Sequence, residues 1–169
     1  MVLAAFLCIV PTNANAVQED EFGPVVRAYL GYLRNEQEVV DDRASRREVS
    51  AKYYRHNSNR IRALRQIAIQ IARETQNDYL PELEAVSRAE LRLLFEQPPR
   101  VETLRIGEVL RQTFRFMGVV RAGEMFYVFA RLDPYEQSEL IEGGGVVKPP
   151  SDQASGVKAG TRTRPATSP

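Results

Sequence analysis

Residues 113–132 read TFRFMGVVRAGEMFYVFARL, and this stretch decides the class of fold. Its apolar residues follow a period of two and are rich in Val, Phe and Tyr, which predicts β-strands. We expect strands at 113–121 and 124–132, joined by a tight turn at Ala122 and Gly123. Residues 104–110 continue the pattern upstream, so the sequence predicts a three-stranded antiparallel meander.

Both faces of the predicted hairpin are apolar. The expected register places Arg121 opposite Glu124 and Phe116 beside Phe129. One layer of helices covers only one face of such a sheet, so the other face needs a second layer or a partner. The partner would be another protein or a second copy of this chain. Three residues of the hairpin are therefore candidate partner-binding residues: Val119, Phe126 and Val128.

Two long helices are expected before the strands. Apolar residues recur at helical spacing over 24–42, and Pro24 suits the first position of a helix. Ser45 and Glu48 have the spacing of a capping box, which predicts that a second helix begins there and runs to about Asn77. We expect a helical hairpin with a break near 41–44. A single bent helix is the alternative, because no Gly or Pro marks the break.

The two predicted helices carry opposite charges, which favours packing side by side. Residues 17–42 hold seven acidic and two basic residues, whereas residues 43–65 hold eight basic residues and one acidic residue. Asn57 interrupts the apolar stripe, either to set the register of a coiled-coil-like seam or where the helix leaves the core. The stripe of the second helix comprises Tyr54, Asn57, Ile61, Leu64, Ala68, Ile71 and Thr75.

Short helices are expected at 81–86 and 88–96, the second opened by a capping box of Ser87 and Glu90. The whole is an α+β fold, with a helical region at 17–97 and a small β-meander packed on it at 98–133. Residues 134–169 are rich in Gly, Pro, Ser and Thr, and their composition predicts a disordered tail.

The first residues indicate export. Val2 to Val10 form an apolar run, and Ala14-Asn15-Ala16 follows as a small-x-small cleavage site, which is the pattern of a signal peptide at 1–16. No Lys or Arg precedes the run, so the n-region looks truncated. The alternative is a buried strand or short helix. Nine residues are too few for a transmembrane helix, which needs about 20. We expect a periplasmic or extracellular protein.

Composition and motifs exclude several kinds of site. One Cys and one His cannot build a disulfide framework or a zinc site of Cys and His ligands. A formal net charge of +1 argues against a nucleic-acid binder. No phosphate-binding, nucleophile-elbow or HExxH motif occurs. We therefore predict no catalytic, cofactor-binding or metal-binding residues. His56 with Tyr53 and Tyr54 is the one local cluster on which an enzyme could depend, and His56 is otherwise a histidine at a helix flank.

The second helix also presents a basic face. Arginine side chains there point away from the apolar stripe and suit anionic groups, and one exposed isoleucine stands among them. These residues are candidates for contact with a partner: Arg55, Arg62, Ile69 and Arg73.

The leading hypothesis is a non-enzymatic exported module for protein interaction or structure, with self-association as one form. The alternative is an envelope-surface module whose arginine face binds anionic lipid or polysaccharide. An enzyme of unknown class is the third.

Overall fold

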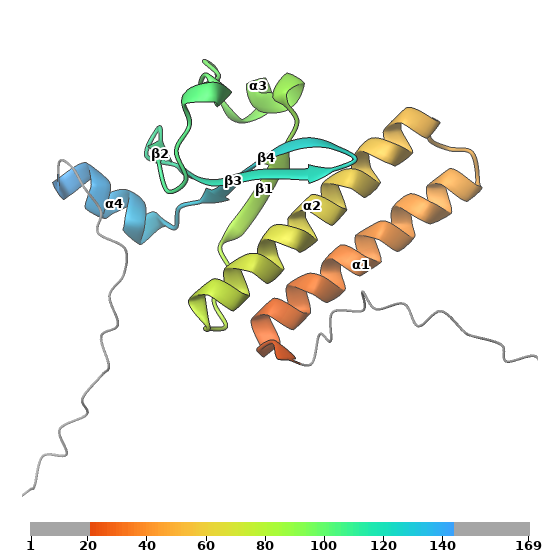
Figure 1. Ribbon diagram of the computed structural model, residues 1–169, viewed down its shortest axis with the longest axis horizontal. Helices are drawn as coiled ribbons and strands as arrows, with labels where there is room; N and C mark the ends of the chain where they lie inside the picture. The colour runs from red at the N-terminus through yellow and green to blue at the C-terminus, as the bar shows by residue number, and fades with distance from the viewer. Residues whose placement is uncertain (1–20, 144–169) are drawn as a thin grey trace, which may run out of the picture.

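The computed structural model describes residues 21–143, in which two long helices precede a four-stranded antiparallel sheet (Figure 1). The strand order is β1-β4-β3-β2, so β1 lies at one edge. This arrangement confirms the α+β class, with one strand more than the sequence predicted. The elements are α1 Pro24–Ser45, α2 Ala51–Thr75, β1 Glu82–Val86, the 3₁₀-helix η2 Arg88–Glu90, α3 Leu91–Leu94, the 3₁₀-helix η3 Val101–Thr103, β2 Val109–Leu110, β3 Phe114–Ala122, β4 Glu124–Arg131 and α4 Pro134–Gly143.

α1 and α2 form the expected helical hairpin, and the alternative of a single bent helix is wrong. Arg47, with a φ of 60°, lies in the short connection that reverses the chain. The connection comes later than predicted because α1 continues to Ser45. The Ser45 hydroxyl donates a hydrogen bond to the carbonyl of Asp42 in the last turn of this helix. The N-cap of α2 is Ser50, whose hydroxyl accepts a hydrogen bond from the N–H of Tyr53 (3.2 Å).

α2 is packed on two sides, by α1 and by the sheet (Figure 1). Ala68 and Ile71 of the predicted stripe are buried, whereas Thr75 at its end is exposed. Because the sheet adds a second contact face, the buried set is wider than one stripe. It comprises Ser58, Ala63, Ile67, Ala68, Ile69, Ile71 and Ala72.

The polar contact between the two long helices differs from the predicted one. The Ser58 hydroxyl accepts a hydrogen bond from the Gln37 amide of α1 (3.0 Å). Asn57 instead donates to the carbonyl of Tyr53 in its own helix (2.9 Å). Asn57 therefore makes no hydrogen bond across this seam.

The predicted short helix at 81–86 is wrong, because this segment is the edge strand β1. Glu82 lies opposite Arg131 and Val86 opposite Tyr127 in an antiparallel pair with β4. Leu83 and Ala85 are buried against the helices, while Glu82 is exposed. A five-residue segment has little helix-forming capacity of its own, so pairing with a central strand decides its conformation.

The hairpin of β3 and β4 has the predicted register along only part of its length. At the turn, Gly123 has a φ of +81° and Arg121 lies opposite Met125 instead of Glu124. The register shifts by one residue between Phe116 and Gly118, in the manner of a β-bulge. Beyond the bulge, Phe116 lies opposite Phe129 as expected.

A second layer from the same chain covers the sheet face that the long helices leave open. Leu91 and Phe95 are buried there, and Phe95 meets the rings of Phe114 and Phe129 edge-on at centroid distances of 5.4 and 5.3 Å. The expected strand at 104–110 is only two residues long, as β2. Leu104 and Leu110 of this segment pack against the same cluster, together with Val101 of η3.

The predicted tail begins with a helix. Just before α4, the Asp133 carboxylate accepts a hydrogen bond from the N–H of Glu136 (2.8 Å), and the Glu136 carboxylate binds Arg115 of β3 (2.9 Å). Residues 134–143 are therefore helical, contrary to the prediction of disorder. The predictions for 1–16 and for the tail from 144 onward lie outside the described residues.

Replacing Phe95 by Ala tests whether the second layer is part of the core. We expect the free energy of unfolding to fall by about 3–5 kcal/mol, because the side chain fills the space between two buried rings. Urea denaturation measures the loss. Leu93→Ala is the control, since Leu93 lies on α3, two residues before Phe95, and is 78% exposed. Equal losses for the two variants would contradict this packing.

Candidate functional site

Two of the predicted partner-binding residues on the hairpin are core residues. Phe126 and Val128 are fully buried against the long helices. Their assignment as contact residues was wrong, because the helices cover their face of the sheet. Val119 points to the other face and is 45% exposed, so it stays a surface residue.

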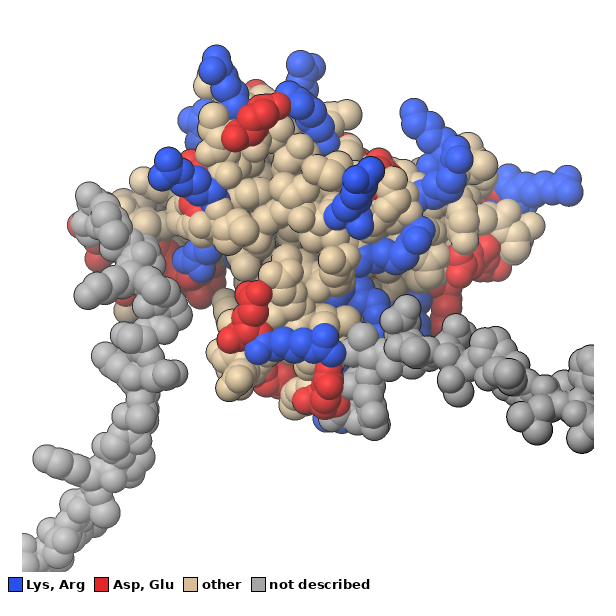
Figure 2. Space-filling view, viewed as in Figure 1, with Lys and Arg blue, Asp and Glu red and all other residues tan. Residues whose placement is uncertain are grey.

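The arginine face of α2 is partly engaged within the chain. Ile69 is buried, contrary to expectation, because it packs in the core. Arg62 donates to the Ser58 carbonyl, and Arg73 binds the carboxylate of Glu21 (2.8 Å). Arg62, Ile69 and Arg73 line one shallow hollow, whereas the exposed Arg55 does not line it. Figure 2 shows basic side chains gathered over α2 and the β3–β4 turn.

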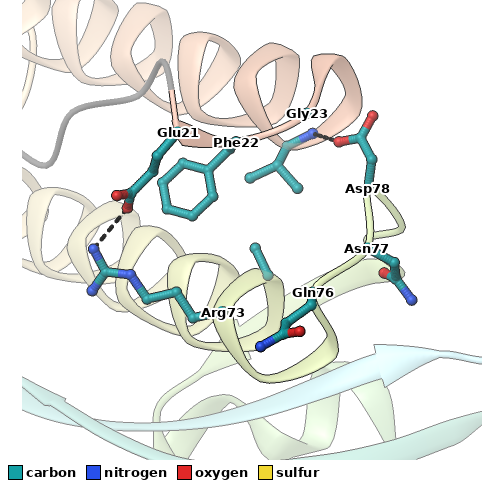
Figure 3. Close-up of a pocket in the computed structure, with 9 residues that line it drawn as sticks. Glu21, Phe22, Gly23, Arg73, Gln76, Asn77 and Asp78 are labelled. Atoms are coloured by element: carbon teal, nitrogen blue, oxygen red, sulfur yellow. Dashed lines mark hydrogen bonds and ion pairs between the residues drawn. The ribbon is translucent and has the colours of Figure 1, made fainter.

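A second hollow, of about 510 Å³, lies where the start of α1 meets the end of α2 (Figure 3). The Asp78 carboxylate accepts hydrogen bonds from the N–H groups of Val25 (2.8 Å) and Val26 (3.0 Å), which caps α1. A Cβ at Gly23 would lie 2.2 Å from the Asp78 side chain, so a larger residue there would displace the carboxylate that caps α1. These contacts join the start of α1 to the segment that follows α2.

A polar cluster lies where α2 meets the hairpin turn and η2. The two ring nitrogens of His56 each lie 2.9 Å from a carboxylate oxygen, Nδ1 from Glu124 and Nε2 from Glu90. Arg60, one turn further along α2, binds the same oxygen of Glu90. The His56 ring also packs on Phe126 with a centroid distance of 5.6 Å. Charged groups from three separate segments therefore hold these elements together.

Neither tyrosine proposed as a companion of His56 shares this cluster. Among the described residues, Tyr53 and Tyr54 make no hydrogen bond or ring contact with His56. Tyr53 is exposed on the outer side of α2. The structure therefore does not bring together the three residues on which an enzyme interpretation depended.

The capping box predicted at Ser87 and Glu90 is present, and it sets the charge of Glu90. Partial burial raises the pKa of this carboxyl, but hydrogen bonds from the Ser87 N–H and hydroxyl and from His56 and Arg60 outweigh it. The net effect lowers the pKa of Glu90 from 4.5 to about 2. Glu90 is therefore ionised in the folded protein over the whole neutral range.

The free edge of β1 is the feature that the sequence did not reveal. The N–H of Leu132, at the end of β4, donates to the carbonyl of Thr113 just before β3 (2.8 Å), so Leu132 directs its backbone groups towards β3. Alternate residues of an antiparallel strand direct their backbone groups to opposite sides, so Phe129 directs its groups to β1. Its partner there is Glu84. Leu83 and Ala85 consequently direct their N–H and C=O groups away from β4, towards a side where the described residues provide no further strand.

A groove of about 580 Å³ lies beside the first part of this edge, where Pro81, Glu82, Leu83 and Glu84 line it. The first turns of α1 form its opposite wall with Val25, Tyr29 and Tyr32, which lie four and three residues apart and so share one face of the helix. Leu64 of α2 and Leu80 before β1 complete the apolar lining. The groove therefore combines unpaired backbone groups on one side with aromatic side chains on the other.

The groove wall formed by α1 is apolar and carries no charge. Burial raises the pKa of the Tyr29 hydroxyl to about 12, with smaller contributions from Tyr32 and Glu84. The rings of Tyr29 and Tyr32 lie 6.2 Å apart. Tyr32 and Val25 remain about half exposed, so their apolar surface is open to a ligand.

The sequence held one clue to this site. Pro81 directly precedes the strand, and Pro is tolerated at the first residue of a strand or at an edge. The clue was indecisive because Pro is equally common at the start of a helix.

Within residues 21–143, no three His, Cys, Asp or Glu side chains are placed to hold a metal ion. None of the helices in this part of the chain is long and apolar enough to cross a membrane. Comparison with protein-family models, curated proteins and solved structures finds no match.

Replacing Glu90 by Gln tests the polar cluster. The folded pKa lies below the unfolded value, so the carboxylate stabilises the fold above pH 4.5, and this contribution is lost as the pH falls towards 2. We expect E90Q to be less stable at neutral pH by about 1–2 kcal/mol, after allowance for screening by water. The difference from the unmodified protein should shrink in acid.

Urea denaturation at neutral pH and at a pH near the folded pKa measures both effects. Glu102→Gln is the control, because the ion pair between Glu102 and Arg88 is exposed and should change stability little. A stability difference for E90Q that is the same at both pH values would contradict the role of the carboxylate.

Proposed function

We propose that this protein is a non-enzymatic, exported protein-interaction module that binds an extended segment of its partner at the free edge of β1. One observation carries the proposal: Leu83, at the free edge of β1, has unpaired backbone groups beside a groove walled by Tyr29 and Tyr32. Strand addition uses this combination, since backbone hydrogen bonds give affinity and neighbouring pockets select side chains.

His56 and Glu90, two groups that could act chemically, have partners within the fold, which supports a binding role. His56 contacts two carboxylates, and Glu90 is held by four hydrogen-bond donors. Export rests on the apolar run and the small-x-small site of residues 1–16, and a secreted or periplasmic location suits a module that binds other proteins.

Self-association through the hairpin has weaker support than the groove. The apolar faces of the β3–β4 hairpin are mostly covered within the chain, and only Val119 and Met125 near its turn remain about half exposed among the large apolar residues described there. Binding to an anionic envelope surface is also less well supported. Of the proposed arginines, Arg73 forms an ion pair with Glu21, which reduces the charge that it offers, and Arg62 donates to the Ser58 carbonyl of its own helix.

Tyr32→Ala tests the groove. Peptides selected from a displayed library on the full chain should bind this variant about tenfold more weakly or worse, because an exposed aromatic side chain in a recognition groove contributes strongly to affinity. Fluorescence anisotropy of the selected peptides measures the change. Tyr53→Ala is the matched control, since Tyr53 is a similarly exposed tyrosine on α2 that lies outside the groove. Selection of no peptide, or equal binding to both variants, would contradict the proposal.

A further inference from the structure

We infer that the segment recognised at β1 alternates apolar residues with Lys or Arg. This inference rests on the proposed function and specifies its ligand. The apolar side chains would enter the groove on the side of the long helices, and the basic side chains would lie beside Glu82 and Glu84.

The two faces of β1 differ in chemistry. Leu83 and Ala85 belong to the core cluster beneath the helices, and Tyr29, Leu64 and Leu80 pack against the same cluster. Glu82 and Glu84 alternate with them along the strand and so point to the opposite face. A strand added beside β1 continues both faces, because its own side chains alternate in the same way. One face of the added strand therefore meets apolar groups and the other meets carboxylates.

The carboxylate face has an excess of negative charge. Arg131 of β4 lies 3.3 Å from Glu82 and 3.9 Å from Glu84, so one guanidinium faces two carboxylates. The Glu82 side chain is 63% exposed. Opposite charges on neighbouring strands stabilise their pairing, and like charges weaken it. Lys or Arg on the added strand would supply the missing cation.

The shape of the groove favours a single strand over a second copy of this protein. α1 stands across the groove from β1, so a strand that already carries its own sheet and helices has little room to enter. Antiparallel pairing of two β1 strands about their centre would also bring Glu84 of one copy opposite Glu84 of the other, which is unfavourable. An extended segment without its own helix layer meets neither obstacle.

Three labelled hexapeptides test this inference on the full chain by fluorescence anisotropy: VKVKVK, its block isomer VVVKKK and the acidic analogue VEVEVE. We expect VKVKVK to bind about tenfold more tightly than either of the others, because only it matches both faces of β1. Glu82→Gln combined with Glu84→Gln should remove most of this preference. Glu108→Gln with Glu142→Gln is the charge-matched control, since neither residue lines the groove.

Each outcome separates this inference from the proposed function. Equal binding of VKVKVK and VVVKKK would overturn the alternation, because it would show attraction by charge alone. Tighter binding of VEVEVE would overturn the charge preference and leave strand addition intact. If none of the three binds while the displayed library still yields peptides sensitive to Tyr32→Ala, the ligand pattern is wrong and the proposed function stands. If the library also yields nothing, both fail.

Discussion

The fold depends on one constraint, the burial of both faces of β4. All five residues from Phe126 to Ala130 are buried, and β4 is flanked by β1 and β3. A strand with two apolar faces must be covered twice, so the helical hairpin packs on one side and the segment around α3 on the other. The position of β1 has a related cause. Because β4 is buried, its backbone groups must be paired on both sides, and β1 is its second hydrogen-bonded neighbour.

The sequence predicted the elements that carry a strong local pattern. The helices α1 and α2 follow from apolar residues at helical spacing, and β3 and β4 follow from alternation. Local patterns failed where tertiary contacts decide. Ser45 and Ser87 both have capping-box spacing, yet only Ser87 is used in that way. Neither the bulge at 116–118 nor the pairing of β1 has a signature that a single sequence reveals.

The candidate site was beyond sequence reasoning for a related reason. Its residues come from α1, α2 and β1, and their side chains are ordinary for helix surfaces and strand edges. What distinguishes the groove is the direction of the backbone groups of Leu83, which depends on the register with β4. The basic face was visible in the sequence, but the internal partners of Arg62 and Arg73 were not.

The pairing of β1 with β4 has a consequence for when the groove exists. β1 ends at Val86 and its partner β4 begins at Glu124, with α3, β2 and β3 between them in the sequence. The pairing of β1 with β4 therefore forms only after a long loop has closed. An edge strand of five residues held on one side is also the part of a sheet that opens most readily by local unfolding. A bound strand would hold β1 from its other side and slow amide exchange there, coupling occupancy of the groove to the local stability of the sheet.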